Sequence, residues 1–246
     1  MRTACNTKES VSYFKNNQLH LITLTPGKKI NVILTGATGM VGEGVLHECL
    51  HHDAVEKVLV LGRSSCGVSH PKLKEIIHPN FFDIQPLEPQ LTGYDTCFFC
   101  LGVSSIGMEE ELYFQQTYIL TLHFAQTVST LNPGMIFCYV SGAGTDSTEK
   151  GSSMWARVKG KTENALMKLP FKKVYLFRPA LLSPTKGLKN TLGFYKWVGW
   201  LIPVCKLIMP NSVSSLHTLG LSMINAAVSG FQKPVLETKD INSTGI

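Results

Sequence analysis

The chain has 246 residues, a length that fits one large α/β domain with enough apolar material for a full core. Its formal net charge of +6 is modest and its lysines and arginines are scattered, so nucleic-acid binding has little support beyond the basic pI and we expect none. Attraction of an anionic cofactor or substrate is the simpler use of a mild positive excess.

The seven cysteines, an odd number, lie mainly in apolar contexts. This usage predicts reduced core residues of a cytoplasmic protein and not a disulfide framework. Residues 1–28 have no continuous apolar stretch after a basic start, so we expect no secretory signal there. We interpret them as a loosely held N-terminal extension, in which Leu19–Leu24 could add an edge strand, and residues 29–246 as a single domain.

The first predicted strand, residues 30–35, runs into a glycine-rich turn and then into a helical pattern that begins at Met40. We expect Gly36 to permit the turn, Gly39 to let backbone amides approach a pyrophosphate, and Gly42 to let the helix pack close to the strand. A helix N-terminus also favours an anion. The residues predicted to contact a dinucleotide here are Gly36, Thr38, Gly39, Met40, Val41 and Gly42.

The second predicted strand, residues 57–62, is followed by Arg63, about 20 residues after the glycine motif. The residue that recognises the adenosine ribose is expected at this place, where an acidic side chain would favour NAD. A guanidinium offers a bidentate fork to a 2′-phosphate, so Arg63 predicts NADP(H) over NAD(H). The alternative is a solvated loop cation.

The rest of the chain alternates apolar strand patterns with helical patterns. The further strands are predicted at 74–78, 95–101, 135–141, 173–178 and 234–237, and the helices at 40–52, 109–131, 152–168 and 215–229. This alternation predicts a doubly wound parallel sheet of the Rossmann type, with right-handed crossovers, and a small C-terminal helical segment on the substrate side. Ligands of such sheets bind beyond the carboxyl ends of the strands.

Polar and small residues follow the predicted strands at that edge. Asp83 could accept a hydrogen bond from an adenine amino group while Ile84 covers the ring, or the two could be an ordinary loop acid and a core residue. Leu101 ends the fourth strand and Gly102 follows it, where a glycine would let the backbone lie against the dinucleotide. Ser141 ends the fifth strand and places a hydroxyl at the nicotinamide end of the crevice.

Together with a lysine on the next helix, these features resemble the atypical or extended short-chain dehydrogenases/reductases. The likeness is strongest to the bacterial proteins labelled NAD-dependent epimerase/dehydratase and to the Tat-interacting oxidoreductase-like branch, and it runs from about residue 29 to the C-terminus. Its motifs are specific for fold and cofactor class and not for substrate. The residues that carry it are the glycine turn at 36–42, Ser141, the stretch Met154–Glu163 with Trp155 and Lys159, and Phe177–Ala180.

The resemblance implies roles for individual residues. In that family a serine steadies the substrate carbonyl, a tyrosine exchanges the proton, and a lysine four residues later holds the nicotinamide ribose. Carried over, these roles make Ser141 and Lys159 catalytic residues, with Lys159 also on the cofactor, and place Arg178 and Pro179 beside the nicotinamide carboxamide. Trp155 occupies the tyrosine position, and its indole has no proton to exchange near neutral pH.

Three explanations of Trp155 stay open. Another group, or a water held by Ser141 and Lys159, relays the proton; the protein binds NADP(H) without turnover as a scaffold or sensor; or the alignment is shifted and Tyr139 or Ser152–Ser153 serves. We expect an NADP(H)-dependent oxidoreductase, or an epimerase/dehydratase-like enzyme, for an apolar carbonyl, alcohol or sugar-like small molecule. The scaffold or sensor is the alternative.

Two further patterns resemble metal or redox motifs. His47–His51 matches HExxH, but the apolar positions around it define the buried face of the helix, so its histidines should face solvent and we expect no metal. Cys97 and Cys100 form a CxxC on a strand, where residues three apart face opposite sides of the sheet. We therefore expect core thiols.

The most apolar stretch is 192–209, which Lys196, Pro203 and Lys206 interrupt, so a membrane-spanning helix is disfavoured. In the resembled fold the surrounding segment, about 188–214, forms a lid over the substrate. Peripheral membrane contact through 192–209 and a plain core helix pair are the alternatives.

The side chains of Trp197, Trp200 and Leu201 within this stretch favour an apolar or aromatic substrate. The sequence leaves open whether the protein is a monomer or a homodimer.

Overall fold

A computed structural model describes residues 29–185, 187–190 and 212–246. In this part of the chain, seven parallel strands form a central sheet in the order β3-β2-β1-β4-β5-β6-β9. The strands are β1 (Ile30–Thr35), β2 (Val55–Gly62), β3 (Leu73–Ile77), β4 (Thr96–Phe99), β5 (Ile136–Val140), β6 (Lys173–Arg178) and β9 (Val235–Glu237). The order reverses between β1 and β4, which creates a crevice at their carboxyl ends.

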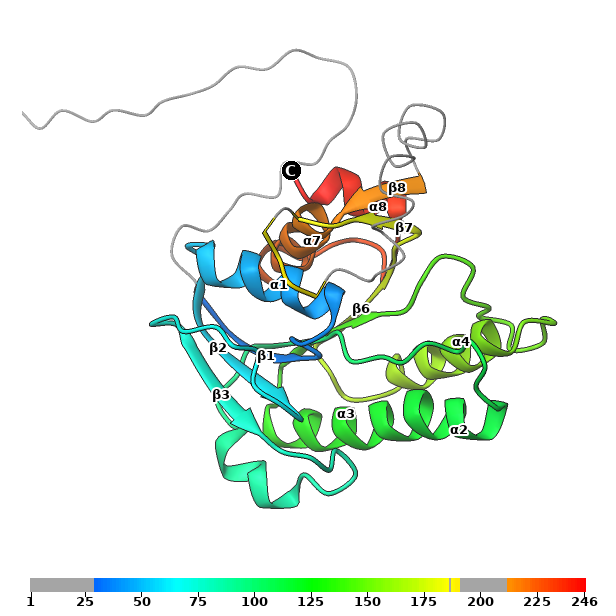
Figure 1. Cartoon of the computed structure of the whole chain (residues 1–246), viewed down its shortest axis with the longest axis horizontal. Helices are drawn as coiled ribbons and strands as arrows, with labels where there is room; N and C mark the ends of the chain where they lie inside the picture. The colour runs from blue at the N-terminus through cyan, green and yellow to red at the C-terminus, as the bar shows by residue number, and fades with distance from the viewer. Residues whose placement is uncertain (1–28, 186, 191–211) are drawn as a thin grey trace, which may run out of the picture.

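Helices cover both faces of the sheet (Figure 1). One face carries α1 (Met40–His51), α7 (Leu216–Ser229) and α8 (Thr238–Thr244). The other carries η1 (Gln85–Gln90), α2 (Glu110–Phe114), η2 (Gln115–Ile119), α3 (Leu120–Leu131) and α4 (Met154–Leu166). A small two-stranded parallel sheet, β7 (Leu181–Ser183) with β8 (Val213–Ser215), lies near α7 and α8.

The core consists of two apolar clusters, one on each face of the sheet. Along β1, Val32 and Leu34 join the cluster under α1 and α7, whereas Ile33 joins the cluster under α3. Because alternate side chains of a strand point to opposite faces, a strand covered on both sides is apolar throughout. The same alternation puts Cys97 in one cluster and Cys100 against the other, as expected for core thiols.

The predicted Rossmann-type architecture is confirmed, with differences in detail. The helix predicted at 109–131 contains the π-helical segment η2 between α2 and α3. The elements η1, β7, β8 and α8 were not predicted, because they are short and hold too few residues to show a period. The fourth strand is also shorter than expected, since pairing ends at Phe99.

Some predictions concern residues outside the described ranges. The N-terminal extension 1–28 and the whole of the apolar stretch 192–209 fall there, and so does most of the lid-like segment 188–214. Within the described ranges, no helix has both the length and the apolar character needed to cross a bilayer.

The glycine turn after β1 is fixed by close backbone contacts. Gly36 has φ of 77°, and a Cβ added to it would lie 2.6 Å from the carbonyl oxygen of Cys100, at the end of β4. A Cβ on Gly42 would lie 2.1 Å from the carbonyl oxygen of Gly36. Only glycine fits at these positions, so α1 packs directly against the turn and the turn against β4.

We expect Gly42→Ala to lower the free energy of unfolding by at least about 2 kcal/mol, because the added methyl group would collide with the main chain of the turn. Gly102→Ala is the matched control: no atom lies within 4 Å of the Cβ that it would add. Urea unfolding of both variants measures the difference. If Gly42→Ala were as stable as the unmodified protein, the close packing of α1 on the turn would be wrong.

Candidate functional site

The glycine turn forms a cradle at the N-terminus of α1. Gly39 is the N-cap residue, and no side chain caps the helix there, so the cap leaves backbone N–H groups for an anion. Its φ of −96° is open to any residue. An added Cβ would meet the carbonyl oxygen of Gly36 only at 3.4 Å, an ordinary contact. The folded chain itself therefore does not require a glycine at position 39.

Gly102, after the neighbouring strand β4, shows the same pattern. It is exposed, its φ is not in the left-handed region, and a Cβ added to it would meet no atom within 4 Å. Gly39 and Gly102 thus leave bare backbone at the ends of two adjacent strands, where the protein's own packing could accept a side chain. A dinucleotide lying against the backbone would need that space, so the cradle fits the predicted cofactor.

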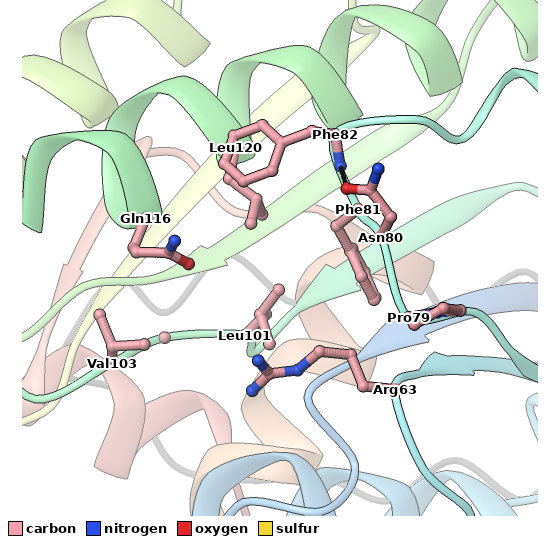
Figure 2. A pocket seen from close by; sticks show the side chains of 10 residues that line it. Arg63, Pro79, Asn80, Phe81, Phe82, Leu101, Val103, Gln116 and Leu120 are labelled. Atoms are coloured by element: carbon pink, nitrogen blue, oxygen red, sulfur yellow. Dashed lines mark hydrogen bonds between the residues drawn. The ribbon is translucent and has the colours of Figure 1, made fainter. Parts of the chain in front are cut away.

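A pocket of about 150 Å³ lies beside this cradle, beyond the ends of β2 and β4 (Figure 2). Arg63 lines it from the end of β2, and its side chain extends toward Leu101. Gln116 reaches the pocket from η2. The lining residues are Arg63, Pro79, Asn80, Phe81, Phe82, Leu101, Gly102, Val103, Gln116 and Leu120. A cation, two aromatic rings and amide groups suit the adenine end of a dinucleotide.

Asp83 and Ile84 do not line this pocket. Ile84 is only 1% exposed, within the core cluster under α3, so its side chain cannot cover a ring from the pocket. Asp83 is exposed, and its carbonyl oxygen lies 2.6 Å from Nε2 of His78. The geometry favours the ordinary loop acid and core residue for this pair, with Asn80 and Phe81 at the pocket in their place.

At the other end of the crevice, the hydroxyl of Ser141 is already engaged. Its Oγ donates to Oε1 of Glu163 at 2.6 Å, and the carbonyl oxygen of Phe177 lies 3.2 Å away. Because a serine has one hydroxyl proton, Ser141 cannot donate to a substrate oxygen while it donates to Glu163. The predicted role of Ser141 requires that this hydrogen bond break.

Arg178 is also engaged, in a buried ion pair with Glu163 of α4. The Glu163 side chain is 1% exposed and that of Arg178 11%, and the Arg178 guanidinium contacts both carboxylate oxygens. Arg178 also pairs with Glu237 at 3.3 Å, and its pKa is raised, chiefly by hydrogen bonding to Glu163. Pro179 is buried, with its carbonyl oxygen accepting from the N–H of Ala143. The guanidinium of Arg178 therefore contacts the carboxylates of Glu163 and Glu237 in the place of a cofactor.

Lys159 lies half-buried on α4, one helical turn before Glu163. Its Nζ is 3.5 Å from the carbonyl oxygen of Val140 and 5.5 Å from the centre of the Tyr139 ring. Loss of solvation lowers the pKa of Lys159 from 10.5 to about 8, against an opposing effect of Glu163. Both contacts are weak, so the amine is available to a ligand.

Trp155 is half-buried at the start of α4, and a Cβ on Gly144 would lie 3.5 Å from its indole ring. The residues considered above as alternative proton donors, Tyr139 and Ser152–Ser153, are not placed for that role. Tyr139 is 1% exposed in the core, and burial raises the pKa of its phenol far above the ordinary value. Ser152 and Ser153 are exposed residues just before α4.

The HExxH segment has ordinary structural partners. Glu48 is buried and lies near two histidines, with Nδ1 of His47 at 3.0 Å and Nδ1 of His217 at 2.8 Å. Nδ1 of His51 lies 2.7 Å from the carbonyl oxygen of His47. In the ranges that the structure describes, no group of three potential ligands is arranged to hold a metal ion.

Glu163 and the residues around Phe81 were not among the predicted site residues. Glu163 could have been found, because it follows Lys159 by four positions and must share its helix face. Gln116 could not, because a π-helical turn changes which side chains face the crevice and leaves no mark in the sequence pattern.

No protein-family model matches the chain. Protein HTATIP2 of Rattus norvegicus is 25% identical over 157 residues, which are 62% of this chain and 62% of the rat protein's length. The structure of MoeE5 in complex with UDP-glucuronic acid and NAD has a TM-score of 0.62 at 13% identity, covering 83% of this chain and 74% of that one.

Two further solved structures share the fold. A UDP-N-acetylglucosamine 4-epimerase from Methanobrevibacter ruminantium M1 has a TM-score of 0.61 at 15% identity, covering 85% of this chain and 76% of its own. A short chain dehydrogenase family protein from Francisella tularensis has a TM-score of 0.58 at 13% identity, with 88% and 95% covered. The predicted resemblance to short-chain dehydrogenases and epimerases is confirmed, and at these identities the solved structures establish the fold alone.

The lowered pKa of Lys159 gives a pH-dependent stability. Below about pH 8 the folded protein carries a poorly solvated ammonium, and this penalty shrinks as the pH rises from 8 toward 10.5, where the folded state has already lost the proton. We expect Lys159→Met to be more stable than the unmodified protein at pH 7 by about 1 to 3 kcal/mol, with a smaller gap at pH 10. Urea unfolding at both pH values measures it. The control is Lys168→Met, at an exposed lysine beyond α4; a gap that is equal at both pH values contradicts the assignment.

Proposed function

We propose that the protein binds NADP(H) in the crevice between β1 and β4 and acts as an oxidoreductase of the short-chain dehydrogenase/reductase type. The observation that carries this proposal is the bare backbone at Gly39 and Gly102, which neither backbone conformation nor internal packing requires. A solved structure of the same fold supports a nicotinamide dinucleotide, since MoeE5 was determined with UDP-glucuronic acid and NAD.

The preference for NADP(H) rests on Arg63. Its guanidinium lines the pocket at the end of β2 and has no ion-pair partner among the described residues. An arginine fork matches the geometry of a phosphate, whereas a ribose 2′-hydroxyl is usually recognised by a carboxylate. Arg63 therefore favours the phosphorylated cofactor, although the MoeE5 structure holds NAD.

The remaining residues would serve the bound cofactor and its substrate. The N-terminus of α1 would hold the pyrophosphate, and Lys159 the nicotinamide ribose. The cofactor, when bound, supplies hydride transfer to or from a carbonyl, alcohol or sugar-like substrate. Ser141 and Arg178 contact Glu163, whereas Lys159 has a proton to exchange and only weak existing contacts.

Fluorescence titration with NADPH and with NADH tests the cofactor. We expect the protein to bind NADPH at least about tenfold more tightly, and Arg63→Glu to abolish or reverse this preference, because a carboxylate repels the 2′-phosphate and accepts from a ribose hydroxyl. Lys168→Glu, at an exposed lysine just beyond α4, is the charge-matched control. An unchanged preference in Arg63→Glu would remove the assignment of NADP(H).

A second candidate function is a dinucleotide-binding scaffold or sensor without turnover. Two observations favour it: Trp155 has no exchangeable proton at the position of the family's tyrosine, and the Ser141 hydroxyl is committed to Glu163. Such a protein would bind the cofactor and act through a partner whose contacts depend on it.

A turnover assay separates the two candidates. The protein is mixed with NADPH and a panel of aldehydes and ketones, and oxidation is followed by absorbance. We expect Trp155→Tyr to raise the rate by ~10²-fold or more, because a phenol beside Lys159 restores a positioned acid; Trp155→Phe controls for the loss of the indole. If both the unmodified protein and Trp155→Tyr bind the cofactor tightly and neither turns over a substrate, the result would favour the scaffold.

A further inference from the structure

The loop after β2 is organised around a carboxylate from the neighbouring strand. Glu75 lies on β3, and its Oε2 accepts the hydroxyl of Ser65 at 2.7 Å while its Oε1 accepts the N–H of Cys66 at 2.6 Å. Ser65 Oγ in turn accepts the N–H of Gly67 at 3.1 Å. Glu75 thus holds Ser65 and Cys66 directly, and Gly67 through Ser65.

These hydrogen bonds engage the charged form of Glu75. Partial burial alone would raise the pKa of the Glu75 carboxyl, but the hydrogen bonds from Cys66 and Ser65 outweigh it and hold the pKa below its ordinary value. Charge-assisted hydrogen bonds of this kind are short and stronger than neutral ones. The loop therefore has a defined conformation although Ser64, Ser65 and Gly67 are exposed.

This loop begins with Arg63, whose position depends on it. Among the residues that the structure describes, no carboxylate pairs with the Arg63 guanidinium, and the side chain is exposed along the pocket (Figure 2). For a long side chain without a partner, the backbone sets the starting point and the direction in which the side chain leaves the main chain. The backbone of Arg63 is fixed on one side by β2 and on the other by the loop that Glu75 holds.

We propose that Glu75 is a positioning residue for cofactor discrimination: through Ser65 and Cys66 it holds the loop that directs Arg63 at the 2′-phosphate. The inference rests on the proposed binding of NADP(H) and adds the determinant that makes Arg63 effective. Glu75 itself does not touch the cofactor in this scheme, since both its oxygens face the loop.

Two variants separate geometry from charge. Glu75→Gln keeps an acceptor for the Cys66 N–H and gains an amide that can donate to Ser65 Oγ, so the loop should keep its shape without the charge. Glu75→Ala removes both contacts. A carboxylate that acted only by its charge would weaken binding of a 2′-phosphate, and both variants would then strengthen it.

The test is the ratio of NADPH to NADH affinity, measured by fluorescence titration. We expect Glu75→Ala to lower this ratio by about tenfold with NADH affinity nearly unchanged, and Glu75→Gln to retain most of it. Glu56→Ala, at an exposed glutamate on β2, is the matched control and should retain it. An unchanged ratio in Glu75→Ala, or an equal loss in Glu75→Gln, would overturn the inference.

Amide hydrogen exchange, measured without cofactor, tests the effect of Glu75 on the loop independently of cofactor binding. The Cys66 amide should be protected in the unmodified protein and exchange faster in Glu75→Ala, while the β2 amides stay protected, which shows that the sheet is intact. An unprotected Cys66 amide would overturn the inference. If the unmodified protein binds NADPH and NADH alike, the proposed NADP(H) preference fails; if it discriminates and Glu75→Ala does too, only the role of Glu75 fails.

Discussion

The contact on which the fold and the site both depend is the stacking of three stretches of main chain at the end of β1. Gly36 lies against the carbonyl group of Cys100, and Gly42 lies against Gly36, so closely that a methyl group fits at neither position. The contact joins β1, β4 and α1 without an intervening side chain. It therefore sets the height of the helix N-terminus above the sheet, and with it the width of the crevice between β1 and β4.

Within that frame the glycines divide into two kinds. Gly36 and Gly42 are required by the folded chain itself, through a left-handed backbone or direct contact. Gly39 and Gly102 are not required by it, because an added Cβ would meet ordinary contact or open space. A glycine that neither backbone conformation nor packing requires is consistent with a ligand lying against the main chain. Here both such residues face the crevice that this fold uses for dinucleotides. The spacing of a motif cannot make this distinction, and the packing around each glycine can.

The sequence predicted what depends on local pattern, and failed where distant residues decide. The apolar runs and the glycine spacing at 36–42 are visible in the local sequence, so the sheet and its crevice could be predicted. The hydroxyl of Ser141 could not be assigned in this way, because its partner Glu163 comes 22 positions later and meets it only when α4 packs on the sheet. Ile84 likewise follows a predicted strand at the ligand-binding edge, but it directly precedes η1 and its side chain lies in the core cluster under α3.

The two ends of the crevice differ in whether their side chains already have partners within the protein. At the end where we propose that adenine binds, Arg63 is unpaired among the described residues and its loop is held in place by Glu75. At the end proposed for the nicotinamide, Arg178 and Ser141 both contact Glu163. Breaking the buried Arg178–Glu163 pair would be destabilising, because one charge would then remain without a partner. Under the proposed function, binding of the dinucleotide would therefore require little rearrangement of the described residues, whereas proton transfer would use Lys159 or require that network to open. Affinity for a dinucleotide and capacity for turnover would for this reason be separate properties, set by different residues at opposite ends of one crevice.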